Sequence, residues 1–247
     1  MDQLPMPDIR ARQSLYRPES FRPFERTWLE HGIPRCFEQR AAICPDHIAI
    51  ADGFGGLSYQ ALNLAANRLA HHLLKVLDSQ ENGTAPIVLL AGQGRDAITA
   101  VLAVLKAGRI VAPLDQRTPI SILSGVLDRL SPAALLVDDE CEAIGTLLAA
   151  DRYPVLAIDS PQSRSPDSNP DRTIEAHDVA CIYFTSGSTG LPKGVADSHR
   201  NVLHNIMRYT NSLGFAEGDR MSLVQNPSFS GTMSTIFGAL LNGATLV

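Results

Sequence analysis

Short apolar runs alternate with longer amphipathic segments along most of this chain. The runs at 86–91, 110–114 and 134–137 are bounded by glycine, proline or polar residues, as buried strands often are. The segments at 95–107 and 120–130 carry apolar residues at helical spacing. Repeated strand–helix–strand units of this kind form a parallel sheet with helices on both faces. We therefore expect a layered α/β fold with a mainly parallel sheet.

The same alternation extends to both sides of this region. Ser58 and Ser198 stand where they would cap the helices that follow them. The helix after Ser58 repeats apolar residues at helical spacing, namely Leu62, Ala65, Leu69 and Leu73. Further helices are expected at 142–150, 199–212 and 233–241, and further strands at 154–158, 179–184, 221–224 and 244–247. Ligands of such sheets bind beyond the carboxyl ends of the strands.

One loop has the composition of a phosphate-binding site. The strand at 179–184 stops at the segment Thr185-Ser186-Gly187-Ser188-Thr189-Gly190-Leu191-Pro192-Lys193-Gly194. Glycines let successive backbone N–H groups turn toward one point, where they form an anion-binding concavity. The hydroxyl groups add donors and Lys193 adds a positive charge, although the spacing is not that of a Walker A motif. The loop therefore predicts a polyphosphate site.

A second glycine pattern offers an alternative nucleotide site. Gly92 and Gly94 follow a strand and open a helix, and Asp115 lies about twenty residues on, as in a dinucleotide fingerprint. This pattern is the case for an NAD(P)-binding Rossmann-type protein. A lone pattern of this kind also marks an ordinary tight turn between a strand and a helix, which is the interpretation we favour.

The composition excludes several classes of protein. The chain has 247 residues, of which 45% are hydrophobic and 19% charged, as in an ordinary globular protein. A net charge of −5 gives no reason to expect nucleic-acid binding, and no apolar run reaches the roughly 18 residues of a membrane span. The cysteines lack C-x-x-C spacing, which indicates reduced, buried thiols in a cytoplasmic protein; they are Cys36, Cys44, Cys141 and Cys181.

The two ends of the chain differ in character. Residues 1–33 are rich in proline, arginine and acidic residues and read as an irregular leader, from which Trp28 and Leu29 are expected to dock onto the body. Residues 34–247 are expected to form one partial domain. The final apolar segment reads as a buried strand that requires neighbours and covering helices. We therefore expect the sequence to be a fragment of a longer protein.

The loop at 185–194 resembles the signature loop of the adenylate-forming enzymes. This superfamily contains acyl-CoA synthetases, luciferases and the adenylation domains of nonribosomal peptide synthetases. The stretches 57–62, 105–115 and 236–246 are similar to further motifs of the superfamily in the same order. The resemblance covers the chain from about Phe37 onward. It implies the N-terminal core of an AMP-binding domain, without its C-terminal part and lid domain.

The resemblance also implies an activity, that of an AMP-forming acid–thiol ligase. Such an enzyme activates a small carboxylic acid with ATP and Mg²⁺ and passes the acyl group to coenzyme A or to the phosphopantetheine of a carrier protein. Thr185 and Lys193 take the catalytic roles. The phosphate-binding residues are Thr185, Ser186, Gly187, Ser188, Thr189, Gly190 and Lys193. The fragment alone is expected to be inactive, and a non-catalytic ATP-binding module is the alternative.

The resemblance places Phe229 and Ser230 in the acyl-substrate pocket. Ser230 stands where amino-acid activators usually carry an aspartate that pairs with the α-ammonium group of the substrate. Because a buried ammonium group without a partner is costly, we expect an acyl or aryl acid or an unusual amino acid. Asn205 and Tyr209 read as ordinary helix residues, His199 as a capping residue, and no metal-ligating cluster is expected.

Overall fold

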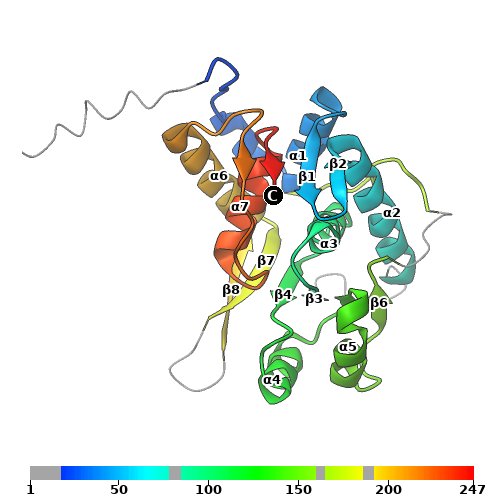
Figure 1. Ribbon diagram of the computed structural model, residues 1–247. Helices are drawn as coiled ribbons and strands as arrows, with labels where there is room; N and C mark the ends of the chain where they lie inside the picture. The colour runs from blue at the N-terminus through cyan, green and yellow to red at the C-terminus, as the bar shows by residue number, and fades with distance from the viewer. Residues whose placement is uncertain (1–17, 78–84, 160–164, 186–191) are drawn as a thin grey trace, which may run out of the picture.

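The computed structural model describes residues 18–77, 85–159, 165–185 and 192–247. Its larger sheet has six strands in the order β6-β5-β3-β4-β7-β8 (Figure 1). These strands are β3 (Ile87–Leu90), β4 (Val111–Leu114), β5 (Ala134–Val137), β6 (Val155–Ala157), β7 (Val179–Thr185) and β8 (Lys193–Ser198). Neighbouring strands run parallel except at one edge, where β8 is antiparallel to β7. The expected α/β fold with a mainly parallel sheet is confirmed.

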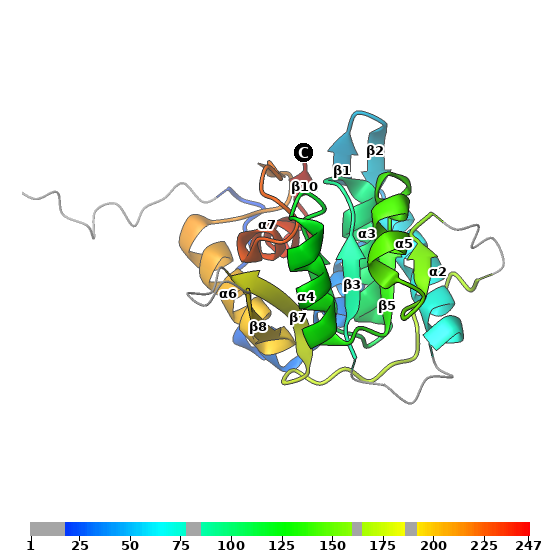
Figure 2. The same cartoon turned by 90° about the horizontal axis from the view of Figure 1, so that it is seen from below.

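Helices cover both faces of this sheet (Figure 2). They are α1 (Ile33–Ile43), α2 (Tyr59–Leu77), α3 (Arg95–Lys106), α4 (Ile120–Leu130), α5 (Glu142–Ala149), α6 (His199–Leu213) and α7 (Ser230–Leu240), with short 3-10 turns at η2 (Arg26–Glu30) and η3 (Asp139–Cys141). Side chains of β3 alternate between the two cores, with Ile87 and Leu89 in one and Val88 and Leu90 in the other. The second core contains α4 and α5, and the first contains the remaining long helices.

A smaller sheet was not expected from the sequence. Its order is β2-β1-β10-β9, formed by β1 (Ile48–Asp52), β2 (Gly55–Ser58), β9 (Arg220–Met221) and β10 (Thr245–Leu246). The expected strand at 221–224 ends at Met221, and Val224 is largely exposed. Strand β10 pairs with β1 on one side and β9 on the other, so earlier parts of the chain supply its neighbours.

The expectations for the helix caps, for the docking of residues 28 and 29 and for the buried thiols are confirmed. The Ser58 and Ser198 hydroxyls accept hydrogen bonds from the backbone N–H groups of Ala61 and Asn201, both at 3.2 Å, at the starts of α2 and α6. Leu29 is buried and Trp28 packs against the same core. All four cysteines are buried free thiols. Within the described ranges, no helix is both long and apolar enough to cross a membrane.

His199 caps a helix other than its own. Its imidazole Nδ1 accepts a hydrogen bond of 3.2 Å from the backbone N–H of Ile33, the first residue of α1. The side chain is buried, and this burial lowers the pKa of His199 to about 4, although the Asp178 carboxylate acts in the opposite direction. A neutral ring is needed for Nδ1 to accept this hydrogen bond. The contact joins α1 to α6 across a sequence separation of 166 residues.

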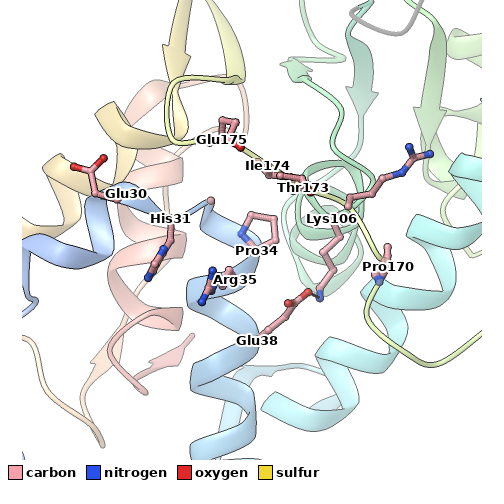
Figure 3. Close-up of a pocket in the computed structure, with 12 residues that line it drawn as sticks. Glu30, His31, Pro34, Arg35, Glu38, Lys106, Pro170, Thr173, Ile174 and Glu175 are labelled. Carbon is pink, nitrogen blue, oxygen red and sulfur yellow. Dashed lines mark hydrogen bonds and ion pairs between the residues drawn. The ribbon is translucent and has the colours of Figure 1, made fainter.

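A buried ion pair joins α1 to α3 beside a cavity of about 310 Å³ (Figure 3). The Lys106 ammonium group bonds to the Glu38 carboxylate and, at 3.2 Å, to Asn169 Oδ1. The Lys106 side chain is fully buried, and burial lowers its pKa while Glu38 opposes that shift. Lys106 thus serves packing between helices.

The His199 contact should make stability depend on pH. In the unfolded chain the imidazole gains a proton below about pH 6.5, whereas in the folded chain it does so only near pH 4. The contact therefore contributes fully to the free energy of unfolding above pH 6.5. This contribution falls by about 3 kcal/mol as the pH falls toward 4. Urea unfolding at several pH values should show the difference between wild type and His199→Gln shrinking across this window. A constant difference would contradict the assignment.

Removing the anion of the buried pair should destabilise the fold. Glu38→Gln leaves the Lys106 ammonium group buried without a countercharge, which typically costs about 3–5 kcal/mol. We expect a matching loss in the free energy of unfolding, measured with urea. Glu175→Gln, an exposed change at the same cavity, is the control and should have little effect. The double change Glu38→Leu with Lys106→Met should recover most of the loss, and no recovery would argue against an electrostatic cause.

Candidate active site

The hairpin of β7 and β8 brings the two ends of the predicted phosphate loop together. Thr185 is the last residue of β7 and Lys193 the first of β8, and the two face each other in the antiparallel pairing. Residues directly opposite in such a pair have Cβ atoms about 5 Å apart and project from the same face. The remaining predicted phosphate-binding residues lie outside the described residues; they are Ser186, Gly187, Ser188, Thr189 and Gly190.

The two faces of this hairpin have different neighbours. Ile182 and Phe184 pack toward the core that contains α4. Tyr183 belongs to the opposite core, and because side chains alternate along a strand, Thr185 lies on the same face as Tyr183. The pairing register places Lys193 and Asp197 on this face as well. The face that carries the predicted catalytic residues is therefore the one turned toward α6 and α7.

A cavity of about 360 Å³ opens on this face of the hairpin. Its wall is formed by β7, β8, α6, α7 and the segment before α7. The lining residues are Tyr183, Asp197, Val202, Asn205, Tyr209, Gln225, Phe229, Ser230, Gly231, Met233 and Ser234. Phe229 and Ser230, predicted to contact the acyl substrate, thus share a wall with residues of the hairpin. The cavity is of the size that small-molecule ligands occupy.

The wall contributed by α6 was not found from the sequence. Asn205 and Tyr209, which read as ordinary helix residues, both line the cavity. They are four positions apart and therefore lie on one face of the helix, as does Val202 three positions earlier. This helical spacing can be read from the sequence. The sequence does not show that this face of α6 turns toward β8, so the role of these residues in the cavity wall could not be predicted from it.

Helix α7 begins at Ser230, three residues earlier than expected. Asn226 organises this start: its Oδ1 accepts hydrogen bonds from the Ser228 backbone at 2.9 Å and hydroxyl at 2.8 Å, and its backbone carbonyl accepts one from the Thr232 hydroxyl at 2.6 Å. Short polar side chains that bond nearby backbone groups in this way favour turns and helix starts. The turn places Phe229 and Ser230 at the cavity.

The carboxyl ends of β3 and β4 hold this segment in place. The Asp115 carboxylate accepts a hydrogen bond of 2.5 Å from Asn226 Nδ2, and the Gln93 amide bonds to the Gln225 carbonyl. Burial alone would raise the pKa of Asp115, but hydrogen bonds from Arg117 and Asn226 hold it below its usual value. Asp115 therefore remains an anion that anchors the approach to α7.

These contacts bear on the dinucleotide alternative. The backbone N–H of Gly92 donates to the Asp138 carboxylate at 2.6 Å, so a protein anion already occupies the donor that a pyrophosphate would use. Asp115, the expected ribose ligand, bonds to Asn226 instead. Gly94 has φ of 140° and allows the turn into α3. The glycine pattern is thus explained as a strand-to-helix turn.

Arg129 lies at the base of the predicted phosphate loop. This residue of α4 donates from its guanidinium group to the carbonyl oxygen of Pro192 at 3.2 Å. Pro192 directly precedes Lys193, so a second cation stands beside the loop. Arg129 could not be predicted as part of the site, because 63 residues separate it from Pro192 and it reads as an ordinary polar residue of an amphipathic helix.

Two buried groups of β7, the Cys181 thiol and the Tyr183 phenol, are held neutral. Burial raises the pKa of the Cys181 thiol to about 12, and burial likewise raises the pKa of the Tyr183 phenol. Cys181 Sγ and the Tyr183 hydroxyl lie 3.0 Å apart in a hydrogen bond. Neither group is suited to act as a nucleophile or base near neutral pH. In the described part of the chain, no group of three or more His, Cys, Asp or Glu side chains is placed to hold a metal ion.

Comparison with known sequences identifies relatives along nearly the whole chain. Malpibaldin synthetase of Mortierella alpina is 32% identical over 234 residues, which cover 92% of this chain and 4% of that protein. Surfactin synthase subunit 1 of Bacillus subtilis (strain 168) is 34% identical over 215 residues, which cover 87% of this chain and 6% of that protein. The chain therefore spans only a small part of the length of these curated relatives.

Solved structures share the fold. The N-terminal subdomain of Klebsiella oxytoca NpsA, in complex with 3-hydroxyanthranilyl-AMSN, matches with a TM-score of 0.72 and 25% identity over 87% of this chain and 52% of that one. The AMPPNP-bound nonribosomal peptide synthetase FmoA3 matches with a TM-score of 0.78 over 96% of this chain and 24% of that one. At 20% identity, the second match bears on the fold alone.

Comparison with models of protein families assigns most of the chain to one family. The sequence model of the family described as AMP-binding enzyme matches residues 37–247. This range contains the hairpin, the cavity and the helices that enclose it. The chain belongs to the AMP-binding enzyme family.

Proposed function

We propose that this chain is part of an ATP-dependent ligase that activates a carboxylic acid as its acyl-adenylate. One observation carries the proposal. Thr185 and Lys193, at the two ends of the predicted phosphate loop, project from the hairpin face that also lines the cavity with Phe229 and Ser230. A nucleotide triphosphate at the loop and an acid in the cavity would therefore meet on one face of the molecule.

The proposed reaction joins the two ligands by displacement at phosphorus. A carboxylate oxygen of the acid attacks the α-phosphorus of ATP, a new O–P bond forms, and the bond from that phosphorus to the bridging oxygen breaks. The products are the acyl-adenylate and pyrophosphate. The main barrier is electrostatic, because an anion approaches a polyanion and negative charge moves onto the leaving group.

The residues of the loop would lower this barrier. Backbone N–H groups and hydroxyls of the 185–190 segment would hold the β- and γ-phosphates, and Lys193 would neutralise charge on them. The donors assigned here are Thr185, Ser186, Gly187, Ser188, Thr189, Gly190 and Lys193. Arg129 supports the loop through its bond to Pro192. Mg²⁺ would enter as the ATP complex, held mainly by phosphate oxygens.

The acyl group would then pass to a thiol. The sulfur attacks the acyl carbon, a C–S bond forms, and the bond from that carbon to the phosphate oxygen breaks, so that AMP leaves and the thiol proton is released to solvent. Coenzyme A and carrier-bound phosphopantetheine are both chemically suitable. A carrier protein is supported by PA1221, described as a protein containing adenylation and PCP domains, which is 28% identical over 89% of this chain and 36% of that one, with a TM-score of 0.72.

The proposal predicts ATP binding that depends on Lys193. A charge-assisted bond is worth about 1.5–3 kcal/mol, so Lys193→Ala should weaken binding of Mg·ATP to the chain about tenfold to hundredfold by isothermal titration. In the full-length protein, the same change should slow ATP–pyrophosphate exchange about a hundredfold. Wild-type exchange in this variant would remove Lys193 from the mechanism.

A matched control uses another lysine of the chain. Lys75→Ala makes the same chemical change at an exposed position of α2, on the opposite side of the molecule from β8 (Figure 1, Figure 2). It should leave Mg·ATP binding unchanged. A parallel titration with NAD⁺ tests the dinucleotide alternative, and binding of NAD⁺ in preference to Mg·ATP would overturn the proposed function.

A further inference from the structure

The cavity beside the hairpin contains an acidic group that the proposed mechanism does not use. Asp197 of β8 is half-buried and lines the cavity together with Ser230 of α7. Its carboxylate accepts a hydrogen bond of 3.4 Å from Asn201 Nδ2, on the same strand-to-helix turn. Across the described ranges, Asp197 forms no ion pair, and no lysine, arginine or histidine lines this cavity.

The rest of the wall supplies no compensating charge. Asn205, Tyr209 and Ser234 are neutral, and burial keeps the Tyr183 phenol neutral as well. Gln225 adds an acceptor, since its Oε1 is buried and, within the described part of the chain, has no hydrogen-bond partner. Among its described residues, the wall therefore has one carboxylate, one buried acceptor without a partner and no cationic side chain. A ligand that carries a positive charge and several N–H donors complements such a wall.

Neither arginine of α6 lines the cavity, and Arg200 pairs with the Glu30 carboxylate. Arg208 is exposed and donates to Asn205 Oδ1 at 3.1 Å, and its guanidinium carbon lies 5.0 Å from the centre of the Tyr209 ring. It contacts two residues of the wall from outside without lining the cavity itself. The Asp197 carboxylate is therefore left facing a cavity whose own wall offers no countercharge.

We propose that Asp197 binds an ammonium group of the acid that this site activates, in place of a partner at position 230. This inference rests on the proposed function and names the class of substrate: a carboxylic acid that also carries an amine. Ser230 cannot neutralise an ammonium group, and the wall formed by β8 supplies the charge that the start of α7 lacks. The substrate would be oriented by the strand itself.

The order of charges along β8 fits this orientation. Lys193 and Asp197 lie on one face of the strand, four residues and so about 13 Å apart. The cation stands at the phosphate-loop end and the anion at the cavity end. A substrate with a carboxylate and an ammonium group would align its carboxylate toward the nucleotide and its ammonium group toward Asp197. The reverse orientation would bring like charges together at both ends.

The test compares pairs of acids that differ by one amine. The chain would be titrated calorimetrically with L-leucine against 4-methylpentanoate and with 6-aminohexanoate against hexanoate. We expect the amino member of at least one pair to bind about tenfold more tightly or better, equivalent to about 1.4 kcal/mol. Asp197→Asn should abolish that preference, and Asp197→Glu, which keeps the charge, should retain part of it.

Controls separate this result from folding and from the proposed function. Asp171→Asn makes the same change at an exposed loop residue that does not line the cavity, and should leave the preference intact. Equal binding of both members of every pair, or an unchanged preference in Asp197→Asn, would overturn the inference. No nucleotide is present in these titrations, so their outcome is independent of the Mg·ATP titration that tests the proposed function.

Discussion

The antiparallel pairing of β8 with β7 is the interaction on which the candidate site depends. The other strands of the larger sheet run parallel to their neighbours. Because β8 runs antiparallel to β7, the end of β7 lies beside the start of β8. This pairing places Thr185 and Lys193 opposite each other, and residues 186–192 connect them in the sequence. Strand β8 lies at the edge of the sheet, and most of its side chains are exposed, Lys193 and Val195 among them. The same pairing fixes which side chains face α6 and α7.

Much of the central sheet was predictable because its strands are buried on both faces. A strand of this kind reads as a continuous apolar run, and β5 was expected at the residues where it lies. Helix α4 was likewise predicted at the residues where it lies. Its apolar residues recur with the period of a helix, which differs from the two-residue period of a strand. The phosphate loop was recognisable because glycines and hydroxyl side chains in one short segment supply many hydrogen-bond donors for an anion. In each case the signal is local, and the residues that create it also form the element.

The elements that the sequence did not reveal depend on distant partners. Strand β8 contains a glycine and exposed side chains and has no apolar alternation, so its extended form follows from pairing with β7. The smaller sheet joins β1 to β10, whose paired residues Ile50 and Leu246 are far apart in the chain. Arg129 acquires a role only when α4 packs beside the hairpin. Tertiary contacts of this kind leave no local period or composition from which they could be predicted.

Burial distinguishes the lysines of this chain in a way that composition cannot. The chain has three, and each has a different environment: Lys106 is fully buried against Glu38, Lys75 is exposed on α2, and Lys193 is exposed at the edge hairpin. A buried ammonium group that already has an anion cannot approach a ligand without losing that partner. A cation on a mobile side chain at the end of a strand can do so at little cost. Of the three lysines, Lys193 is therefore the one that the hairpin makes available to a nucleotide. Asp197 lies on the same face of β8, toward the cavity.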